Sequence, residues 1–269
     1  WALGKPHMKN FLAPLLVLVF AFSASAELLA GAAARSIVPP FPTYMGGFGD
    51  RMQFFEGVHD DIFARALVLD NGETQLVVIG SDLMSLDDEH ARGVRERVEK
   101  ETGVPGANVM VSCVHNHSAP SYYQHKDPTE QAKVRAFLVK QFSDAVIEAF
   151  QKREPAEIGW AMGELRGATR NRQQDNDTVI DPQLMVVRVE KLEGREIIAT
   201  LFNFTGHPVI QGSKNLLLSG EYPGAACRAI QKVVGGVAIF TQGACGDITV
   251  NRQGDPWLDP AWSRESGPV

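Results

Sequence analysis

Two histidines one residue apart, His115 and His117, have the residue type and spacing most suited to chemistry in this sequence. They follow a mostly apolar run that begins at Val109, and such a run is typical of a strand. Residues i and i+2 of an extended backbone point to the same side, so both imidazoles are expected to face one pocket at the strand end. Because imidazole is the commonest metal ligand and titrates near neutral pH, the pair favours a metal or acid–base site, although it could simply cap a strand.

Other polar side chains also come directly after apolar runs. His207 follows the run over 197–203, Asp82 follows 75–80, and Asp247 and Thr249 follow 236–241. In open α/β sheets, ligands bind at the carboxyl ends of the strands. A catalytic zinc takes about three ligands from His, Asp, Glu or Cys and keeps one position for water. We therefore expect His115 and His207 to be metal ligands.

The remaining candidates have more than one possible role. Asp82 and Asp247 could be ligands, carboxylates that orient a histidine, or turn caps, and we favour the last two because such partners accompany metal-bound histidines. Arg172 could bind a substrate oxygen or an oxyanion. Thr249 could contact substrate or act as a nucleophile, although the sequence assigns it no base.

Apolar strand-like runs alternate with amphipathic helices along the chain. Helices are expected from Leu86 to about Glu101, from Pro128 to Phe150, and from Glu221 to about Lys232. A hairpin turn is expected at Asp70-Asn71-Gly72-Glu73, and a short edge strand in 30–40, which ends in prolines. Further strands are expected at 64–69, 75–80, from 109, 156–164, 183–190, 197–203 and 236–241. The pattern predicts an α/β fold, a layered mixed β-sheet flanked by helices, with the site at the strand C-terminal ends.

Composition limits the classes of function. The chain has 269 residues, 44% of them hydrophobic and 22% charged, with a net charge of −6. This is ordinary globular composition, and without a basic run we expect no nucleic-acid partner. The three cysteines, Cys113, Cys227 and Cys245, are an odd number, so at least one thiol is unpaired within the chain.

The N-terminal residues have the pattern of a secretory signal. A positive start at Met8-Lys9 leads into an apolar run over 11–22 and then Ala24-Ser25-Ala26. We expect residues 8–26 to be a signal peptide, cleaved before Glu27, that exports the protein to the periplasm or the medium. The run is short for a membrane span, so a retained anchor is the weaker alternative. Residues 1–26 are thus set apart from a catalytic domain over 27–269.

Several stretches, in order, resemble the neutral/alkaline non-lysosomal ceramidase family, N-terminal catalytic domain. Val114-His115-Asn116-His117-Ser118-Ala119-Pro120 is similar to the family's Thr-His-Thr-His-Ser-Gly-Pro, and Phe204-Thr205-Gly206-His207-Pro208 to its second histidine segment. The likeness continues through Met45-Gly46-Gly47-Phe48, Gly57-Val58-His59-Asp60, Asn171-Arg172 and the Gly-Asp-x-x-x-Asn pattern of 246–251.

The resemblance implies a zinc-dependent amidohydrolase that releases a fatty acid from a ceramide-like, N-acylated lipid at a membrane surface. His115 and His207 would bind Zn²⁺. His117 would bind substrate or move a proton, Arg172 would hold the substrate, and Thr249 stands where the family has its active-site serine. His59, Asp82 and Asp247 would lie around the ligands and orient them.

Departures from the family pattern keep other interpretations open. Thr249 and Val250 replace Ser-Pro, and threonine adds a methyl group and a stiffer χ1. The family's other zinc ligands, a glutamate and a tyrosine, lie far beyond this motif, so we expect them beyond Val269 and the domain to be incomplete at its C-terminus. The alternatives are an inactive exported lipid- or glycan-binding relative, and a metal-dependent hydrolase of another bond, such as an ester.

Overall fold

The structure, a computed structural model, describes residues 27–173 and 179–250. The predicted signal peptide and the C-terminal residues 251–269 lie outside the described residues. The helices are α1 (Asp88–Thr102), α2 (Pro128–Gln151) and α3 (Glu221–Val234), with a short 3₁₀ turn at Gly106–Asn108. The strands are β1 (Leu29–Ser36), β2 (Tyr44–Met45), β3 (Gly57–Val58), β4 (Phe63–Asp70), β5 (Gln75–Ser81), β6 (Val109–Cys113), β7 (Pro120–Ser121), β8 (Glu154–Glu164), β9 (Thr169–Asn171), β10 (Gln183–Lys191), β11 (Ile197–Phe204), β12 (Leu217–Leu218), β13 (Val237–Gln242) and β14 (Ile248–Val250).

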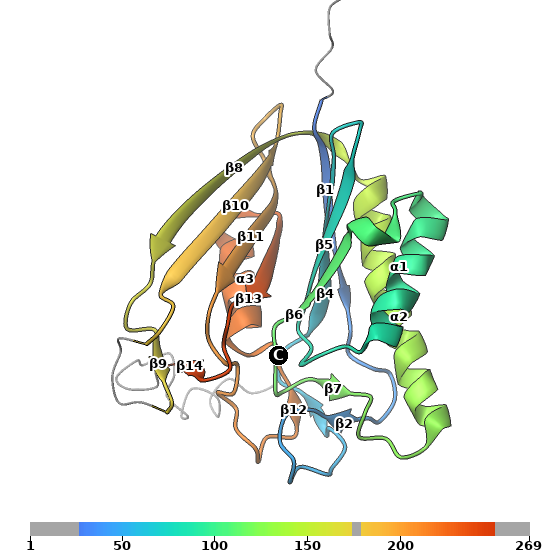
Figure 1. Cartoon of the computed structure of the whole chain (residues 1–269), viewed down its shortest axis with the longest axis vertical. Helices are drawn as coiled ribbons and strands as arrows, with labels where there is room; N and C mark the ends of the chain where they lie inside the picture. Colours follow the sequence, from blue (N-terminus) through green and yellow to red (C-terminus); the bar gives the residue numbers. More distant parts are fainter. Residues whose placement is uncertain (1–26, 174–178, 251–269) are drawn as a thin grey trace, which may run out of the picture.

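One mixed sheet of eight strands forms the framework, in the order β13-β11-β10-β8-β1-β4-β5-β6. The pairs β5–β6 and β11–β13 are parallel, and the other pairs are antiparallel. The sheet folds back on itself, so that its β8-β10-β11-β13 half lies against its β1-β4-β5-β6 half (Figure 1). The two parallel pairs therefore bring the carboxyl ends of four strands to the same region of the molecule.

Small side chains let the two halves of the sheet approach closely. Ala30, Ala32 and Ala199 form a buried cluster with Leu67 and Ile239. At Gly80 a Cβ atom would lie 2.6 Å from the Ile239 side chain, so only glycine fits there. The prediction of an edge strand near 30–40 was wrong: β1 is central, between β8 and β4. Its alanines fill the narrow gap between the half-sheets.

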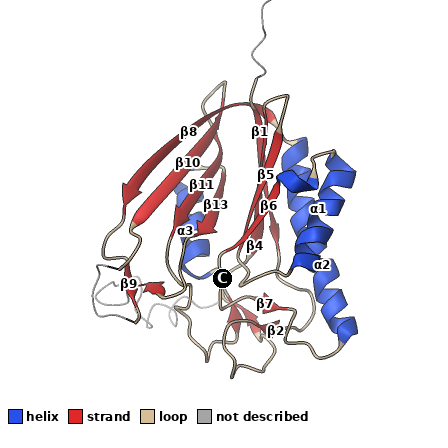
Figure 2. Cartoon of the chain, viewed as in Figure 1, coloured by secondary structure: helices blue, strands red, loops and turns tan. Residues whose placement is uncertain are grey.

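Helices cover the outer faces of the folded sheet (Figure 2). α2 packs on β1 and β4, and α1 packs on α2. Fully buried Phe142, Leu138 and Val146 of α2 meet Val68 and Ile79 in the largest hydrophobic cluster. On the other half, α3 packs on β13. The predicted α/β architecture of a mixed sheet with flanking helices is therefore confirmed, and no described helix is long and apolar enough to cross a bilayer.

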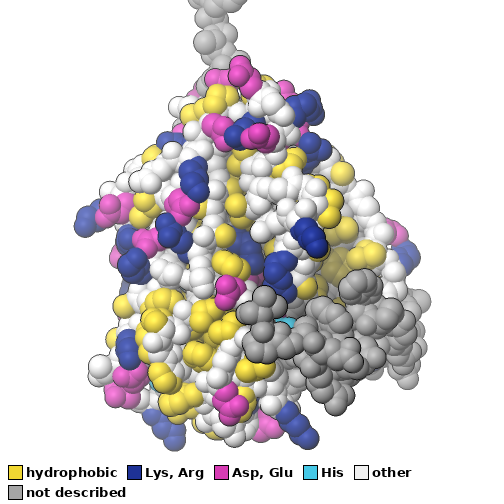
Figure 3. Space-filling model, turned by 180° about the vertical axis from the view of Figure 1, so that it is seen from behind, with side chains coloured by type: hydrophobic (Ala, Val, Ile, Leu, Met, Phe, Trp, Pro, Cys, Tyr) yellow, Lys and Arg dark blue, Asp and Glu magenta, His cyan; other side chains and the backbone are white. Residues whose placement is uncertain are grey.

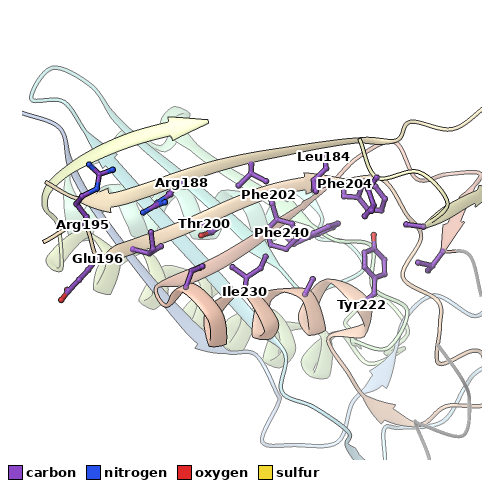
Figure 4. A pocket seen from close by; sticks show the side chains of 17 residues that line it. Leu184, Arg188, Arg195, Glu196, Thr200, Phe202, Phe204, Tyr222, Ile230 and Phe240 are labelled. Carbon is purple, nitrogen blue, oxygen red and sulfur yellow. The ribbon is translucent and has the colours of Figure 1, made fainter. Parts of the chain in front are cut away.

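The outer face of the second half-sheet is only partly covered. Beside α3 runs a groove of about 800 Å³ whose lining is largely apolar. Phe202 and Phe204 of β11, Phe240 of β13 and Ile230 of α3 point into it, with Tyr222 towards one end and Arg195 towards the other (Figure 4). The fold thus leaves an unfilled apolar surface next to α3.

The start of α1 gives a direct test of the local structure. Asp87 is the N-cap; its side chain accepts a hydrogen bond from His90 N at 2.9 Å. Without the Asp87 carboxylate, the N–H of His90 at the helix start loses its acceptor. We therefore expect Asp87→Ala to lower the free energy of unfolding by about 1–2 kcal/mol. Urea unfolding checks this, with exposed Asp88→Ala as the neighbouring control. Equal effects of the two substitutions would show that the cap does not stabilise α1.

Candidate metal centre

His115 and His117 lie in the loop after β6, which ends at Cys113. The expected extended geometry is wrong, because His115 has φ = 64° and turns the chain sharply. The apolar run is also less buried than expected, since β6 is at the sheet edge and Met110 is 47% exposed. The two imidazoles nevertheless face the same site, because of the turn rather than strand alternation.

Buried Asn116 fixes the shape of this turn. Its Nδ2 donates to the carbonyl oxygens of Asp82 at 3.0 Å and Ser219 at 2.6 Å, and its Oδ1 accepts from Ser118 N at 2.7 Å. A buried amide satisfied on both sides holds its backbone in one conformation. Asn116 therefore aims the flanking imidazoles while its own side chain points into the protein.

Three imidazoles converge at this end of the sheet. His207 follows β11, and its ring centroid lies 4.6 Å from that of His115 and 4.8 Å from that of His117. The Nε2 atoms of His117 and His207 are 3.0 Å apart. One ligand atom from each of the three residues lies within 4.8 Å of the others. The structure therefore brings together residues almost a hundred positions apart, in a geometry that a single ion can bridge.

Backbone carbonyls orient two of these rings. The Nδ1 atom of His207 lies 3.1 Å from the Cys245 oxygen, and that of His115 lies 3.3 Å from the Met84 oxygen. A carbonyl oxygen only accepts, so Nδ1–H is the donor and Nε2 keeps the lone pair that a metal needs. His117 Nδ1 is buried without a hydrogen-bond partner among the described residues. Three imidazoles that each offer a ring nitrogen as a ligand, with His117 Nδ1 left unpaired among the residues that the structure describes, fit a site for a divalent cation such as zinc.

The three side chains expected to orient the metal-binding histidines have other hydrogen-bond partners. Asp82 accepts from Arg65 Nη1 and from Phe63 N, both at 2.8 Å. Asp247 accepts from Asn171 Nδ2 at 2.9 Å. His59 Nδ1 lies 2.7 Å from Asp60 Oδ2. Within the described part of the chain, carbonyl groups thus replace Asp82, Asp247 and His59 in orienting His115 and His207, because these three side chains are engaged elsewhere.

The small β9–β14 ribbon positions Arg172 and Thr249 beside the histidines. Arg172 N donates to Asp247 O at 2.9 Å and its guanidinium to Gly246 O. Half-buried Thr249 forms an isolated parallel bridge with His207, whose N donates to Ile248 O at 2.9 Å. Desolvation is the main reason that the pKa values of His117 and His207 are lowered, and the Arg172 charge lowers them further. The structure thus places the five candidate ligands and catalytic residues at one end of the fold.

A small cavity of about 290 Å³ opens onto His115 and His117. Gly47 and Phe48 line it together with Met84 and Tyr123. Gly47 has φ = 101°, and a Cβ atom there would lie 2.3 Å from the His117 ring. Only glycine therefore permits this close approach, which explains the glycine at position 47.

Burial keeps the imidazoles of His117 and His207 neutral. Desolvation, followed by the neighbouring His207, His115, Arg51 and Arg172 charges, lowers the pKa of His117 to about 3. Burial and His115 also lower the pKa of His207, although its contact with the Cys245 carbonyl opposes this. Neutral imidazole is the form that binds metal, so both groups are in the ligating state at neutral pH.

These depressed pKa values predict a pH dependence for the metal-free chain. Below about pH 6.5 an unfolded His117 binds a proton that the folded chain excludes until about pH 3. The unfolded state thus binds more protons over this window, and stability falls as the pH drops through it. Urea unfolding at pH 7.5 and pH 5.5 measures this effect, which should be smaller in His117→Gln. An equal pH dependence in that variant would contradict the assignment to His117.

Sequence patterns did not reveal Arg51, a buried arginine behind the site. It is 2% exposed, and its guanidinium donates to the carbonyl oxygens of Gly46, His117 and Asn215. Arg51 follows Asp50 in a glycine-rich loop, where a charged residue is usually solvated. No local pattern identifies it, because its partners come from three separate segments.

Comparisons with known protein sequences point to one family. The family model for neutral/alkaline non-lysosomal ceramidase, N-terminal, matches residues 31–260. The neutral ceramidase of Pseudomonas aeruginosa is 27% identical over 241 residues, which cover 80% of this chain and 36% of that protein. The neutral ceramidase of Mycobacterium tuberculosis is 25% identical over 244 residues, covering 78% and 38%. The chain thus spans little more than a third of the length of these curated relatives.

Solved structures show the same fold. The crystal structure of neutral ceramidase from Pseudomonas aeruginosa superposes with a TM-score of 0.76 at 22% identity, over 90% of this chain and 43% of that one. A ceramidase complexed with C2 gives a TM-score of 0.74 at 25% identity, over 84% and 39%. Since the family model covers most of the sequence, including the convergent histidines, the chain belongs to the neutral/alkaline non-lysosomal ceramidase family.

Proposed function

We propose that this chain is the N-terminal catalytic portion of an exported, zinc-dependent hydrolase that cleaves the N-acyl amide bond of a ceramide-like lipid. The observation that carries the proposal is the convergence of the His115, His117 and His207 rings on one point beside a cavity. The names of the relatives, both neutral ceramidases, support ceramide as the substrate class.

Each side chain has a chemical task in this proposal. His115 and His207 would hold zinc through Nε2, and zinc there would supply Lewis acidity to the reacting carbonyl. Neutral His117 is placed to accept or deliver a proton next to the reacting group. Exposed Arg172, whose guanidinium donates to Gly246 O, would stabilise a developing oxyanion. The Thr249 hydroxyl, held beside His207, would contact the substrate.

We also propose that the domain continues in a longer protein. The curated relatives are much longer than the part that matches here. Two histidines leave a tetrahedral zinc in need of further ligands, and a glutamate and a tyrosine beyond residue 269 would complete the shell. The signal-like residues 8–26 support export, which would bring the enzyme to N-acylated lipid at a membrane surface.

Incubation of the zinc-loaded protein with an N-acyl sphingosine tests the activity, with release of free fatty acid as the readout. We expect amide hydrolysis that stops when a chelator removes zinc and returns when zinc is added. Preferential cleavage of a matched ester would favour the alternative interpretation, a metal-dependent hydrolase of ester bonds. Lipid binding without hydrolysis by the full-length, zinc-loaded protein would favour the inactive binding relative, for which the threonine at position 249 is the supporting observation.

A further inference from the structure

The Glu221 carboxylate lies between the two loops that carry the imidazoles. Its Oε1 accepts from Ser118 Oγ at 2.9 Å and from Gln211 N at 3.1 Å, and its Oε2 accepts from Ile210 N at 2.9 Å. Ser118 directly follows His117, and residues 210 and 211 closely follow His207. A single side chain therefore connects the His115–His117 loop to the His207 loop.

The backbone holds Glu221 in an uncommon conformation for this purpose. It is the first residue of α3, is 5% exposed and has φ = 52°. Non-glycine residues seldom adopt this left-handed region, and such strain persists only where the surroundings require it. Its N–H donates to Ser219 Oγ at 3.0 Å, and the positive end of α3 favours the carboxylate. Hydrogen bonds to both its backbone and its side chain thus hold Glu221 in this strained conformation.

One backbone hydrogen bond and one buried guanidinium also hold the His115–His117 loop. His117 N donates to Pro208 O at 3.3 Å, and the Arg51 guanidinium holds the His117 carbonyl from the other side. Desolvation lowers the pKa of the Arg51 guanidinium, and the Glu221 charge is one of three nearby groups that oppose this shift. Of these contacts, the carboxylate of Glu221 accepts hydrogen bonds from both loops at once. One donor is the Ser118 hydroxyl, and the other donors are the backbone N–H groups of residues 210 and 211.

We propose that Glu221 is a positioning residue for the metal centre, which clamps the two histidine loops at the spacing that one ion requires. Charge-assisted hydrogen bonds from three donors are strong and directional. Without them, the contact of His117 N with Pro208 O, the bond from Asn215 Nδ2 to Ser118 Oγ and the Arg51 guanidinium would still join the loops. The carboxylate that holds Ser118 against residues 210 and 211 would be lost. This inference rests on the proposed metal site for its first test, but the second test below is independent of metal and of hydrolysis.

Glu221→Gln is the first test, because glutamine keeps the shape but replaces one acceptor oxygen with an N–H donor. That donor would face a backbone or hydroxyl donor, so the clamp loses at least one bond. We expect the zinc dissociation constant to rise about tenfold or more, as for other groups that support ligands. Ser118→Ala removes one of the three bonds to the carboxylate, together with the bond that Ser118 Oγ accepts from Asn215 Nδ2 at 3.3 Å, and should give a smaller rise. Glu96→Gln is the matched control, since the Glu96 side chain is 70% exposed and lies 3.8 Å from Arg92.

Chemical labelling of the metal-free chain is the second test. Diethyl pyrocarbonate modifies accessible imidazoles, and His207 is only 5% exposed in the parent. With all variants well below their melting temperatures, we expect faster labelling of His207 in Glu221→Gln than in the parent or in Glu96→Gln. Unchanged labelling, or an unchanged zinc dissociation constant in a folded variant, would overturn the proposal. The zinc dissociation constants are measured in the longer protein, which carries the remaining ligands. If that protein binds no zinc, the proposed function fails and the labelling alone decides; if Glu221→Gln does not fold, Ser118→Ala decides.

The apolar groove beside α3 carries a second, independent inference. Two helices, α1 and α2, lie over the outer side of the first half-sheet, whereas α3 alone covers the second (Figure 2). Leu184, Val186 and Phe202 line the groove from the sheet, facing Ile230 and Ala226 of α3. Seen from behind, this side of the molecule shows hydrophobic side chains at its surface among charged ones (Figure 3). Within residues 27–173 and 179–250, one helix thus covers the second half-sheet where two lie over the first.

We infer that a helix from the continuation of this chain in a longer protein occupies the groove. The relatives' lengths, of which this chain spans 36% and 38%, leave ample polypeptide for such a helix. Val250, the last residue that the structure describes, itself lines the groove. The apolar face of an amphipathic helix suits this lining, and this inference does not depend on the catalytic proposal.

A fluorescent apolar dye, bis-ANS, tests which surface is open. We expect the 269-residue chain to bind the dye, Ile230→Glu to lose that binding, and Val233→Glu to keep it, because Val233 is 82% exposed and does not line the groove. In the longer protein from the same gene, dye binding should disappear and amide exchange in α3 should slow. Equal dye binding by the longer protein, a gene without a continuation, or a groove-mediated dimer that persists in the longer protein would overturn the inference.

Discussion

His207→Ala is expected to abolish both zinc binding and N-acyl amide hydrolysis. The variant removes one of three rings that meet within 4.8 Å, and the remaining pair, His115 and His117, comes from a single loop. Since even groups that merely support ligands change metal affinity 10–100-fold, we expect zinc affinity to fall by about 100-fold or more. Zinc titration and fatty-acid release measure the two effects, and loss of activity should follow loss of metal.

A second buried histidine provides the control for this substitution. His125 is 6% exposed, and its Nε2 lies 2.6 Å from Thr43 Oγ1, away from the three-histidine cluster. His125→Ala therefore removes a buried imidazole without removing a candidate ligand, and zinc binding should persist in the folded variant. If His207→Ala kept the parent's zinc affinity, or if His125→Ala lost as much in a folded state, the cluster would not be the metal site.

Asp82→Ala is expected to give the largest loss of stability. The Asp82 and Arg65 side chains are 1% and 4% exposed and lie 2.8 Å apart. Removal of the carboxylate leaves a buried guanidinium without its charge partner, which typically costs about 3–5 kcal/mol. Urea unfolding should show this loss in the free energy of unfolding. Because Asp82 supports the site only through its carbonyl contact with Asn116, zinc affinity of the folded variant should change much less than in His207→Ala.

The double variant Arg65→Met/Asp82→Ala separates charge burial from packing. Replacement of a whole buried ion pair by apolar groups is often close to neutral, so the second substitution should restore much of the lost stability. The exposed pair Arg92–Glu96 is the surface control, and Glu96→Ala should change stability by less than about 0.5 kcal/mol. A loss below about 1 kcal/mol in Asp82→Ala would contradict the importance of the buried pair.

Regular elements were predictable where the side chains are periodic. The α2 helix begins at Pro128 as predicted and ends one residue beyond the predicted Phe150, because a proline start and an apolar stripe mark its extent. The hairpin at Asp70–Glu73 joins β4 to β5 as predicted. β1 was misplaced at the edge of the sheet, since a run of alanines shows neither which face is buried nor which strands lie beside it.

The convergence of the three histidines was predictable, but the groups that support them were not. His115, His117 and His207 meet as their spacing suggested, yet the first pair does so through a left-handed turn that no strand pattern shows. Asp82 pairs with Arg65 of the neighbouring strand rather than with a histidine. Glu221 had the pattern of an ordinary acidic residue at a helix start. Such partners are set by which strands and loops become neighbours, which a local sequence window does not contain.

Zinc-edge anomalous diffraction from crystals of the zinc-loaded protein tests the central claim most directly. The account predicts one ion about 2.0–2.1 Å from Nε2 of both His115 and His207, with His117 alongside. An ion bound elsewhere, or coordinated by only one of these two imidazoles, would contradict it.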